Sequence, residues 1–209
     1  MPHDSEVLAF PAPCLIMTVM TVLPKVRNLL FPLPVTLVTC RARRGDTAAD
    51  NIIPLSWVGI VEHKPHSVSI CIGTEKYSAR VIGRRREFGL CLPPVALMDS
   101  VDRCGCTHGD RTDKFAMTGL TKAAAAKIDA PLIAECPVCL ECRVTRAVSL
   151  STYRMFIAEV LCTHVSGEFL KKDGSPDLER MNVLCYADDE YWALGKRLEP
   201  LYYTRKKGV

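Results

Sequence analysis

Apolar and polar residues alternate along several short stretches of the chain, and this period of two predicts β-strands. The clearest case is residues 67–72, where Val68, Ile70 and Ile72 alternate with two serines and a cysteine, as in a half-buried strand. Strands are also predicted at residues 35–40, 88–92, 138–149 and 155–165. The last two are long, which favours a curled sheet or barrel over a flat sheet.

The segment Asn51 to Ile60 is apolar around a few polar residues and contains Trp57, one of the 2 tryptophans. Its composition predicts one strand, paired as a hairpin with residues 35–40 across a polar turn at residues 41–50. Pro54 cannot donate a ladder hydrogen bond, so the strand is expected to bulge or to border an opening there. An opening leaves backbone groups free for a ligand, and this strand is therefore the candidate floor of a binding site.

Helices are predicted between the strands rather than in regular alternation with them. The sequence indicates helices over residues 79–86, from Pro94 through Val101, and over 122–127, where Thr121 can cap the first turn. No glycine-rich dinucleotide fingerprint or phosphate-binding P-loop is present. The expected fold is mainly β with inserted helices, with residues 1–24 as an extension and residues 25–209 as one domain.

Composition narrows the class of protein. With 209 residues and 48% hydrophobic residues the chain can bury a core, and its net charge of +4 favours an anionic ligand over nucleic acid. The apolar run at residues 15–23 is shorter than the roughly 20 residues that span a bilayer, and no basic region precedes it. The 11 cysteines, an odd number without a secretory signal, indicate reduced thiols and a cytoplasmic location. We expect neither a membrane nor a nucleic-acid partner.

Cys136, Cys139 and Cys142 are spaced like metal ligands. On a strand, however, Cys139 and Cys142 point to opposite faces, so the three thiols converge poorly. Cys106 and His108, with Cys104, could add ligands from a loop. We interpret the thiols as small buried apolar groups and predict no metal site, while a thiol metal-binding protein stays the weaker alternative.

Two polar segments are candidates for anion binding. The loop Cys104 to Phe115 is either solvated surface or a site in which Lys114 reaches an anion while Phe115 packs beneath it. The turn Gly73 to Ser78 joins a strand to a helix, where free N–H groups bind anions, although a plain helix cap would look the same.

Several motifs together resemble the flavin reductase-like, FMN-binding split-barrel family, and within it the flavoredoxin-like branch. They occur in the family's order over roughly residues 28–200: Phe31-Pro-Leu-Pro-Val35, Ser56-Trp57 inside the segment 51–59, Tyr77-Ser78, Cys104-Gly105 followed by Asp113-Lys114-Phe115, Ala130 to Cys136, and Met155 to Val160. Gly73, Glu75 and Cys139 depart from the family's usual residues.

The resemblance implies a split β-barrel that binds FMN. The cofactor-binding residues that it implies are Asn51, Leu55, Ser56, Trp57, Thr74, Tyr77, Ser78, Cys104, Gly105, Lys114, Phe115, Tyr153 and Tyr186. It also implies an oxidoreductase that takes electrons from NAD(P)H or a redox protein and passes them to a flavin, iron or another acceptor. A non-enzymatic FMN-binding electron carrier is the alternative. No catalytic residue is assigned, and a homodimer with the flavin near the subunit boundary is expected.

Overall fold

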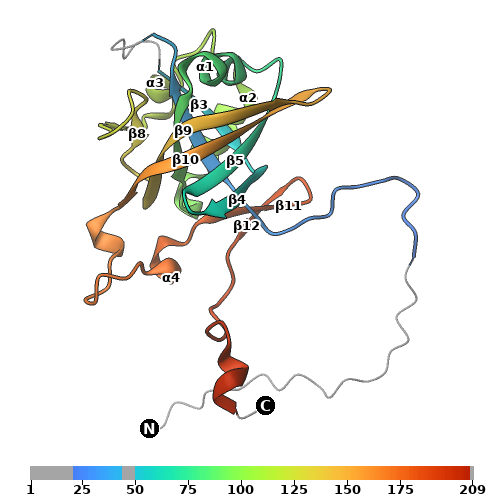
Figure 1. Cartoon of the computed structure of the whole chain (residues 1–209), viewed down its shortest axis with the longest axis vertical. Helices are drawn as coiled ribbons and strands as arrows, with labels where there is room; N and C mark the ends of the chain where they lie inside the picture. The colour runs from blue at the N-terminus through green and yellow to red at the C-terminus, as the bar shows by residue number, and fades with distance from the viewer. Residues whose placement is uncertain (1–20, 44–49, 208–209) are drawn as a thin grey trace.

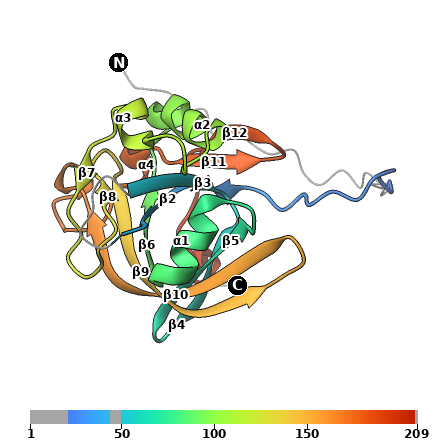
Figure 2. The same cartoon turned by 90° about the horizontal axis from the view of Figure 1, so that it is seen from above.

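A curled antiparallel sheet forms the body of the protein (Figures 1 and 2). The structure, a computed structural model, describes residues 21–43 and 50–207. The sheet has seven strands in the order β3-β2-β6-β9-β10-β5-β4, and each neighbouring pair is antiparallel. The strands are β2 (Thr36–Arg41), β3 (Asp50–Leu55), β4 (Val58–His63), β5 (His66–Gly73), β6 (Glu87–Leu92), β9 (Val138–Ser149) and β10 (Tyr153–Val165).

Short helices and two small sheets complete the fold. The helices are α1 (Tyr77–Arg85), η2 (Val95–Leu97), α2 (Met98–Cys106), α3 (Lys114–Thr118), η3 (Gly167–Phe169), α4 (Leu178–Met181) and η4 (Tyr203–Lys207). One small sheet joins β1 (Leu33–Pro34), β11 (Leu184–Ala187) and β12 (Glu190–Ala193), and the other joins β7 (Lys122–Ala123) and β8 (Leu132–Ile133). The predicted mainly β fold with inserted helices is confirmed.

Two apolar clusters form the core, and β9 contributes to both. One cluster contains Cys139 and the other contains Cys142, as the alternation of strand side chains predicts. Phe88 and Phe156 are fully buried in the second cluster, which also contains the buried apolar residues of α1. Burying each phenyl ring stabilises the fold by about 1.5–3 kcal/mol. Helix α1, which rests on β2, β3 and β5, is thereby held in place against the sheet.

The expected single strand from Asn51 to Ile60 is in fact two strands. The chain turns at Ser56 and Trp57, where the N–H of Val58 donates to the carbonyl of Ser56 at 3.0 Å. β3 and β4 are the two edge strands of the seven-stranded sheet and do not pair with each other. The turn at Ser56 and Trp57 therefore connects the two edges where the barrel stays open. Pro54 is accommodated because β3 is an edge strand, which among the described strands pairs only with β2.

The expected helix at residues 122–127 is wrong. Residues 122–123 form β7, and the N–H groups of Ala126, Lys127 and Ile128 donate to the carboxylate of Glu141 instead of to a helical ladder. Glu141 is fully buried on β9, so this tertiary contact, invisible in the local pattern, decides the conformation of the segment. The predicted hairpin from residue 35 is confirmed by the pairing of β2 with β3.

The loop predicted from Cys104 to Phe115 is shorter than expected. Helix α2 continues to Cys106, and α3 begins at Lys114 because Asp113 caps it, accepting a hydrogen bond from the N–H of Ala116 at 3.1 Å. Only residues 107–113 lie between the two helices. Both ends of this segment are therefore fixed by helices.

Most of the predicted extension, residues 1–20, lies outside the described residues. The chain from residue 22 to 32 runs away from the sheet and exposes apolar side chains such as Val26 and Leu30 (Figure 1). Among the described helices, none is long and apolar enough to cross a membrane.

Candidate functional site

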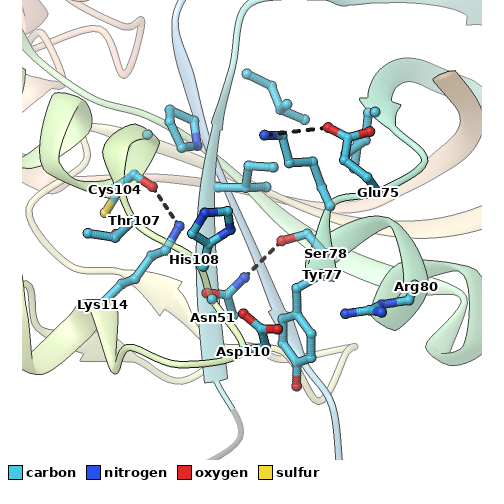
Figure 3. Close-up of a pocket in the computed structure, with 18 of the residues that line it drawn as sticks. Asn51, Glu75, Tyr77, Ser78, Arg80, Cys104, Thr107, His108, Asp110 and Lys114 are labelled. Atoms are coloured by element: carbon cyan, nitrogen blue, oxygen red, sulfur yellow. Dashed lines mark hydrogen bonds and ion pairs between the residues drawn. The ribbon is translucent and has the colours of Figure 1, made fainter. Parts of the chain in front are cut away.

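A concave pocket of about 380 Å³ lies where β3 ends and α1 begins. Its walls come from the junction between β3 and β4, the first turns of α1, the end of α2 and the segment 107–110 (Figure 3). Ligand pockets typically measure about 300–1,000 Å³, so the space suits a single small molecule. The site therefore forms where the break at Ser56 and Trp57 opens the sheet.

Lys114 places a buried positive charge in the wall of this pocket. Its side chain is 3% exposed, and its Nζ donates to the carbonyl oxygen of Cys104 at 2.5 Å (Figure 3). No carboxylate among the described residues lies within 4.0 Å of this ammonium group. Burial lowers the pKa of Lys114 below its usual value, because the charged form loses hydration. An anionic ligand would supply the missing counter-charge.

Cys104, beside this lysine, carries a neutral thiol. Burial raises the pKa of Cys104 to about 11, although the charge of Lys114 opposes the shift. The residue is 1% exposed and packs in the core cluster that also contains Phe115. Its contribution to the site is the carbonyl that holds Lys114, and the thiol itself is not activated as a nucleophile.

Asn51 joins the strand side of the pocket to the helix side. Its Nδ2 donates to Oγ of Ser78 at 2.8 Å, which ties β3 to the first turn of α1. The other amide atom, Oδ1, is buried and has no hydrogen-bond partner among the described residues. A buried acceptor without a donor is costly, so a ligand N–H or O–H at this position would be stabilised.

Trp57 and Tyr153 form an aromatic pair at the rim. Their ring centroids are 4.7 Å apart with an interplanar angle of 27°, which is a stacked arrangement. Trp57 is 42% exposed, so the pair offers an open aromatic edge to a planar ligand. The residues come from the β3–β4 junction and the start of β10, which the pairing of Tyr153 with Gly73 brings together.

The end of the pocket near α1 carries mixed charge. Nζ of Lys76 lies 3.5 Å from a carboxylate oxygen of Glu75, and Arg80 extends from the next turn (Figure 3). A Cβ at position 73 would lie 2.6 Å from the carboxylate of Glu75, so Gly73 permits this arrangement. The strand-to-helix turn thus offers two cations to an anion and one carboxylate that partly offsets them.

The structure brings most of the predicted site residues together. Those that line the pocket are Asn51, Leu55, Ser56, Trp57, Tyr77, Ser78, Cys104, Gly105, Lys114 and Tyr153. Thr74 does not line it, because its hydroxyl donates to the carbonyl of Thr152 at 3.2 Å. Phe115 lies in the core, as expected for a residue that packs beneath Lys114. Tyr186 lies on β11 in a neighbouring cavity, which shares Trp57 with the pocket.

Several lining residues were not predicted from the sequence to bind the cofactor, among them Arg80, His108 and Asp110. The last two belong to the polar segment after α2, whose composition also fits a solvated loop. Gly109 was the available signal, because a Cβ there would lie 2.2 Å from Oδ1 of Asn51. Only a glycine lets this segment lie directly on β3.

Of the thiols proposed as alternative metal ligands, Cys136 and Cys139 contact each other and Cys91 in the core, but in the described part of the chain no three of the proposed ligands bring their atoms within 4.8 Å of one another. There, the cluster of three ligand-type side chains with atoms within 4.8 Å consists of Glu141, Cys162 and His164. Its carboxylate already accepts three backbone N–H groups and lies 2.5 Å from Nε2 of His164. These bonds outweigh burial and lower the pKa of Glu141. The hydrogen bonds of Glu141 therefore explain this cluster as a structural contact that holds the segment 126–128 in place.

Comparison with known proteins identifies the family. A flavin reductase like domain matches residues 27–195, and the chain therefore belongs to the flavin reductase-like family. The fold is accordingly the split barrel of this family.

Particular relatives agree with this assignment. The flavoredoxin of Desulfovibrio vulgaris is 28% identical with a TM-score of 0.81, over 89% of this chain and 100% of that one. A flavoredoxin from Methanosarcina acetivorans is 25% identical with a TM-score of 0.78, over 90% and 100% of the two chains. An uncharacterised protein of Archaeoglobus fulgidus is 29% identical over 74% of this chain and 84% of its own length.

Proposed function

We propose that the protein binds FMN in the pocket beside Lys114 and acts as an oxidoreductase. Electrons would come from NAD(P)H or a redox protein and pass to a flavin, iron or another acceptor. The observation that carries the proposal is the buried ammonium of Lys114, which faces a ligand-sized pocket without a carboxylate partner among the described residues. An anionic planar cofactor would be complementary to the site in both charge and shape.

Each wall of the pocket has a role in this proposal. The stacked pair of Trp57 and Tyr153 presents its open edge to the ring system, and Asn51 accepts a hydrogen bond from it. The turn before α1 receives the phosphate near Lys76 and Ser78. When bound, the flavin supplies the redox chemistry by accepting and releasing electrons in ones or twos. Lys114 stabilises negative charge that develops on the cofactor as it is reduced. No side chain needs to act as a catalytic acid or base.

Turnover distinguishes the enzyme from the alternative, a non-enzymatic electron carrier. The purified protein loaded with FMN is mixed with NADH or NADPH, with and without added free flavin, and absorbance at the nicotinamide band is followed. The proposal expects catalytic oxidation that depends on the acceptor. Oxidation limited to one equivalent per bound FMN favours the carrier.

We further propose a homodimer, on the basis of the apolar surface around β4. Ile60 is 80% exposed and Val61 is 47% exposed on this edge strand. A cavity of about 830 Å³ beside it is lined by Leu29, Leu30 and Trp57, so the N-terminal segment extends the same surface. A two-fold interface would bury this surface on both subunits at once. Sedimentation equilibrium tests the proposal, since a species near 23.2 kDa that still holds FMN would contradict it.

A further inference from the structure

Three buried cysteines, which we call the thiol cluster, meet where the chain enters β9 (Figure 2). Cys136 precedes the strand, Cys139 lies on it, and Cys91 lies on the adjacent strand β6, directly opposite Cys139 in the antiparallel pairing. The thiol of Cys139 is in hydrogen-bond contact with the thiols of both other residues. All three are free thiols in the same core cluster. The fold therefore places neighbouring sulfur atoms within reach of one another.

The thiol cluster lies close to the surface. Cys136 is 5% exposed and Cys139 is 4% exposed, while Ala134 and Glu135, just before them, are exposed. On the other side of β9, the side chain of His164, which is opposite Cys139 on β10, is 37% exposed. A small molecule therefore needs only a local opening of the segment before β9 to reach the sulfur atoms.

Cys139 is the member of the cluster best placed to become a thiolate. As a thiol it donates to the carbonyl of Ile133 at 3.5 Å, and when deprotonated it accepts hydrogen bonds from its two neighbouring thiols. The bonds from Cys136 and then Cys91 lower the pKa of Cys139 well below its usual range, although burial opposes them. Where such donors are missing, burial raises the pKa of Cys142 to about 12. Because the thiolate is the nucleophile, Cys139 is the reactive thiol of the cluster.

Cys136 is better placed than Cys91 to form a disulfide with Cys139. Residues directly opposite in a sheet have Cβ atoms about 4.5–5.5 Å apart, whereas a disulfide needs about 3.5–4.5 Å. Cys91 cannot move closer easily, because β6 is held between β2 and β9. Cys136 follows a turn outside the regular strands, in which its N–H donates to the carbonyl of Ile133 at 3.2 Å. Its two-residue separation from Cys139 is the spacing of redox-active cysteine pairs.

We propose that Cys136 and Cys139 form a dithiol that a peroxide oxidises reversibly to a disulfide. The Cys139 thiolate attacks one oxygen of hydrogen peroxide, so that an S–O bond forms, the O–O bond breaks, and the departing hydroxide takes up a proton to leave as water. The Cys136 thiol then attacks the sulfur of this sulfenic acid: the S–S bond forms, the S–O bond breaks, and a second water leaves. The two thiols lose two electrons, and one peroxide is reduced to two waters. None of these steps requires the proposed cofactor.

The test uses the full-length, reduced protein. It is treated with hydrogen peroxide for increasing times, its remaining thiols are alkylated under denaturing conditions, and it is digested with a protease that cleaves after glutamate. Cleavage after Glu135 and Glu141 releases residues 136–141, whose only cysteines are Cys136 and Cys139. Mass spectrometry should find this peptide with an internal disulfide and without alkyl groups. Dithiothreitol added before alkylation should restore both thiols by exchange.

Cys142 provides the matched internal control, since it is equally close in sequence to Cys139 but lies in the other core cluster. The disulfide should form about tenfold or more faster than Cys142 is oxidised, because only the cluster holds a stabilised thiolate. Cys136→Ala should abolish the disulfide and leave a sulfenic acid on Cys139 that dimedone traps. Cys142→Ala should leave the disulfide unchanged.

Several results would overturn the proposal. One is a peptide 136–141 that stays fully alkylated while the exposed Cys106 is oxidised, and another is oxidation no faster than that of Cys142. A crosslink between Cys91 and Cys139 would show that the reactive pair is wrong. Stoichiometric zinc in the purified protein, released by peroxide, would show a metal site instead. If a variant fails to fold, the wild-type peptide alone decides.

Discussion

Asn51 on β3 donates from Nδ2 to Oγ of Ser78 on α1, at 2.8 Å, and this bond closes the floor of the pocket. Above it, the segment after α2 approaches Asn51 so closely that only glycine fits at position 109. The site therefore depends on three segments that meet at one asparagine.

Gly109→Ala should weaken FMN binding and destabilise the protein. The added methyl group would lie 2.2 Å from Oδ1 of Asn51, so the segment must move away from β3. Overpacking of this kind costs about 1–3 kcal/mol, measured as the free energy of unfolding in urea. Gly167→Ala is the control, because a Cβ there meets nothing within 4 Å. Equal stability of the two variants would show that the segment is not held on Asn51.

Lys114→Met should weaken FMN binding by about 1–3 kcal/mol, because it removes a charge-assisted interaction with the cofactor while retaining much of the side-chain volume. The unliganded variant should be no less stable than the wild type, since the buried charge has no carboxylate partner among the described residues. Fluorescence-quenching titration measures the affinity. Arg111→Ala, at a nearby cation that does not line the pocket, is the control and should leave the affinity unchanged.

The same lysine predicts a pH dependence of stability. Because the pKa of Lys114 is lowered in the folded protein, the unfolded chain binds more protons between the folded pKa and the ordinary value of 10.5. The free energy of unfolding of the unliganded protein should therefore gain a positive contribution as the pH rises through this window. The contribution should be missing in Lys114→Met, so the difference between the two proteins should narrow or reverse towards alkaline pH. A constant difference would contradict the lowered pKa.

Glu141→Gln should loosen the segment 126–128. The wild-type carboxylate accepts hydrogen bonds from all three backbone N–H groups, and an amide cannot accept them with both of its terminal atoms. We expect a loss of about 1–3 kcal/mol in unfolding free energy and faster hydrogen exchange at these amides. Glu159→Gln, on the adjacent strand β10, is the control. Unchanged exchange in Glu141→Gln would show that the segment is held by other contacts.

The sequence predicted the strands well where alternation is local, as in β5, β9 and β10. It failed where a contact distant in sequence decides the backbone, as at residues 126–128, whose N–H groups turn to Glu141. It also joined β3 and β4, because the composition of 51–60 does not show that the strands pair with different neighbours.

The same difference between local patterns and contacts distant in sequence applies to the candidate site. The composition of the segment 51–60 and of the loop around Lys114 marked both as candidate binding elements, and the resemblance to the family assigned Asn51, Trp57 and Lys114 to the cofactor. The structure gathers these three residues around one pocket. The stacking of Trp57 on Tyr153 depends on the register of β10 with β5, which no local pattern contains. Tyr186 was implied by the resemblance to the family, and it lies on a separate small sheet.

The central claim is that this pocket binds FMN, and the most direct measurement is a titration of the purified, unliganded protein with FMN, followed by flavin fluorescence. The account predicts saturable quenching at one FMN per chain, weakened in Lys114→Met and unchanged in Arg111→Ala. A protein that leaves the fluorescence of FMN unchanged throughout the titration, and that purifies without flavin absorbance, would contradict it.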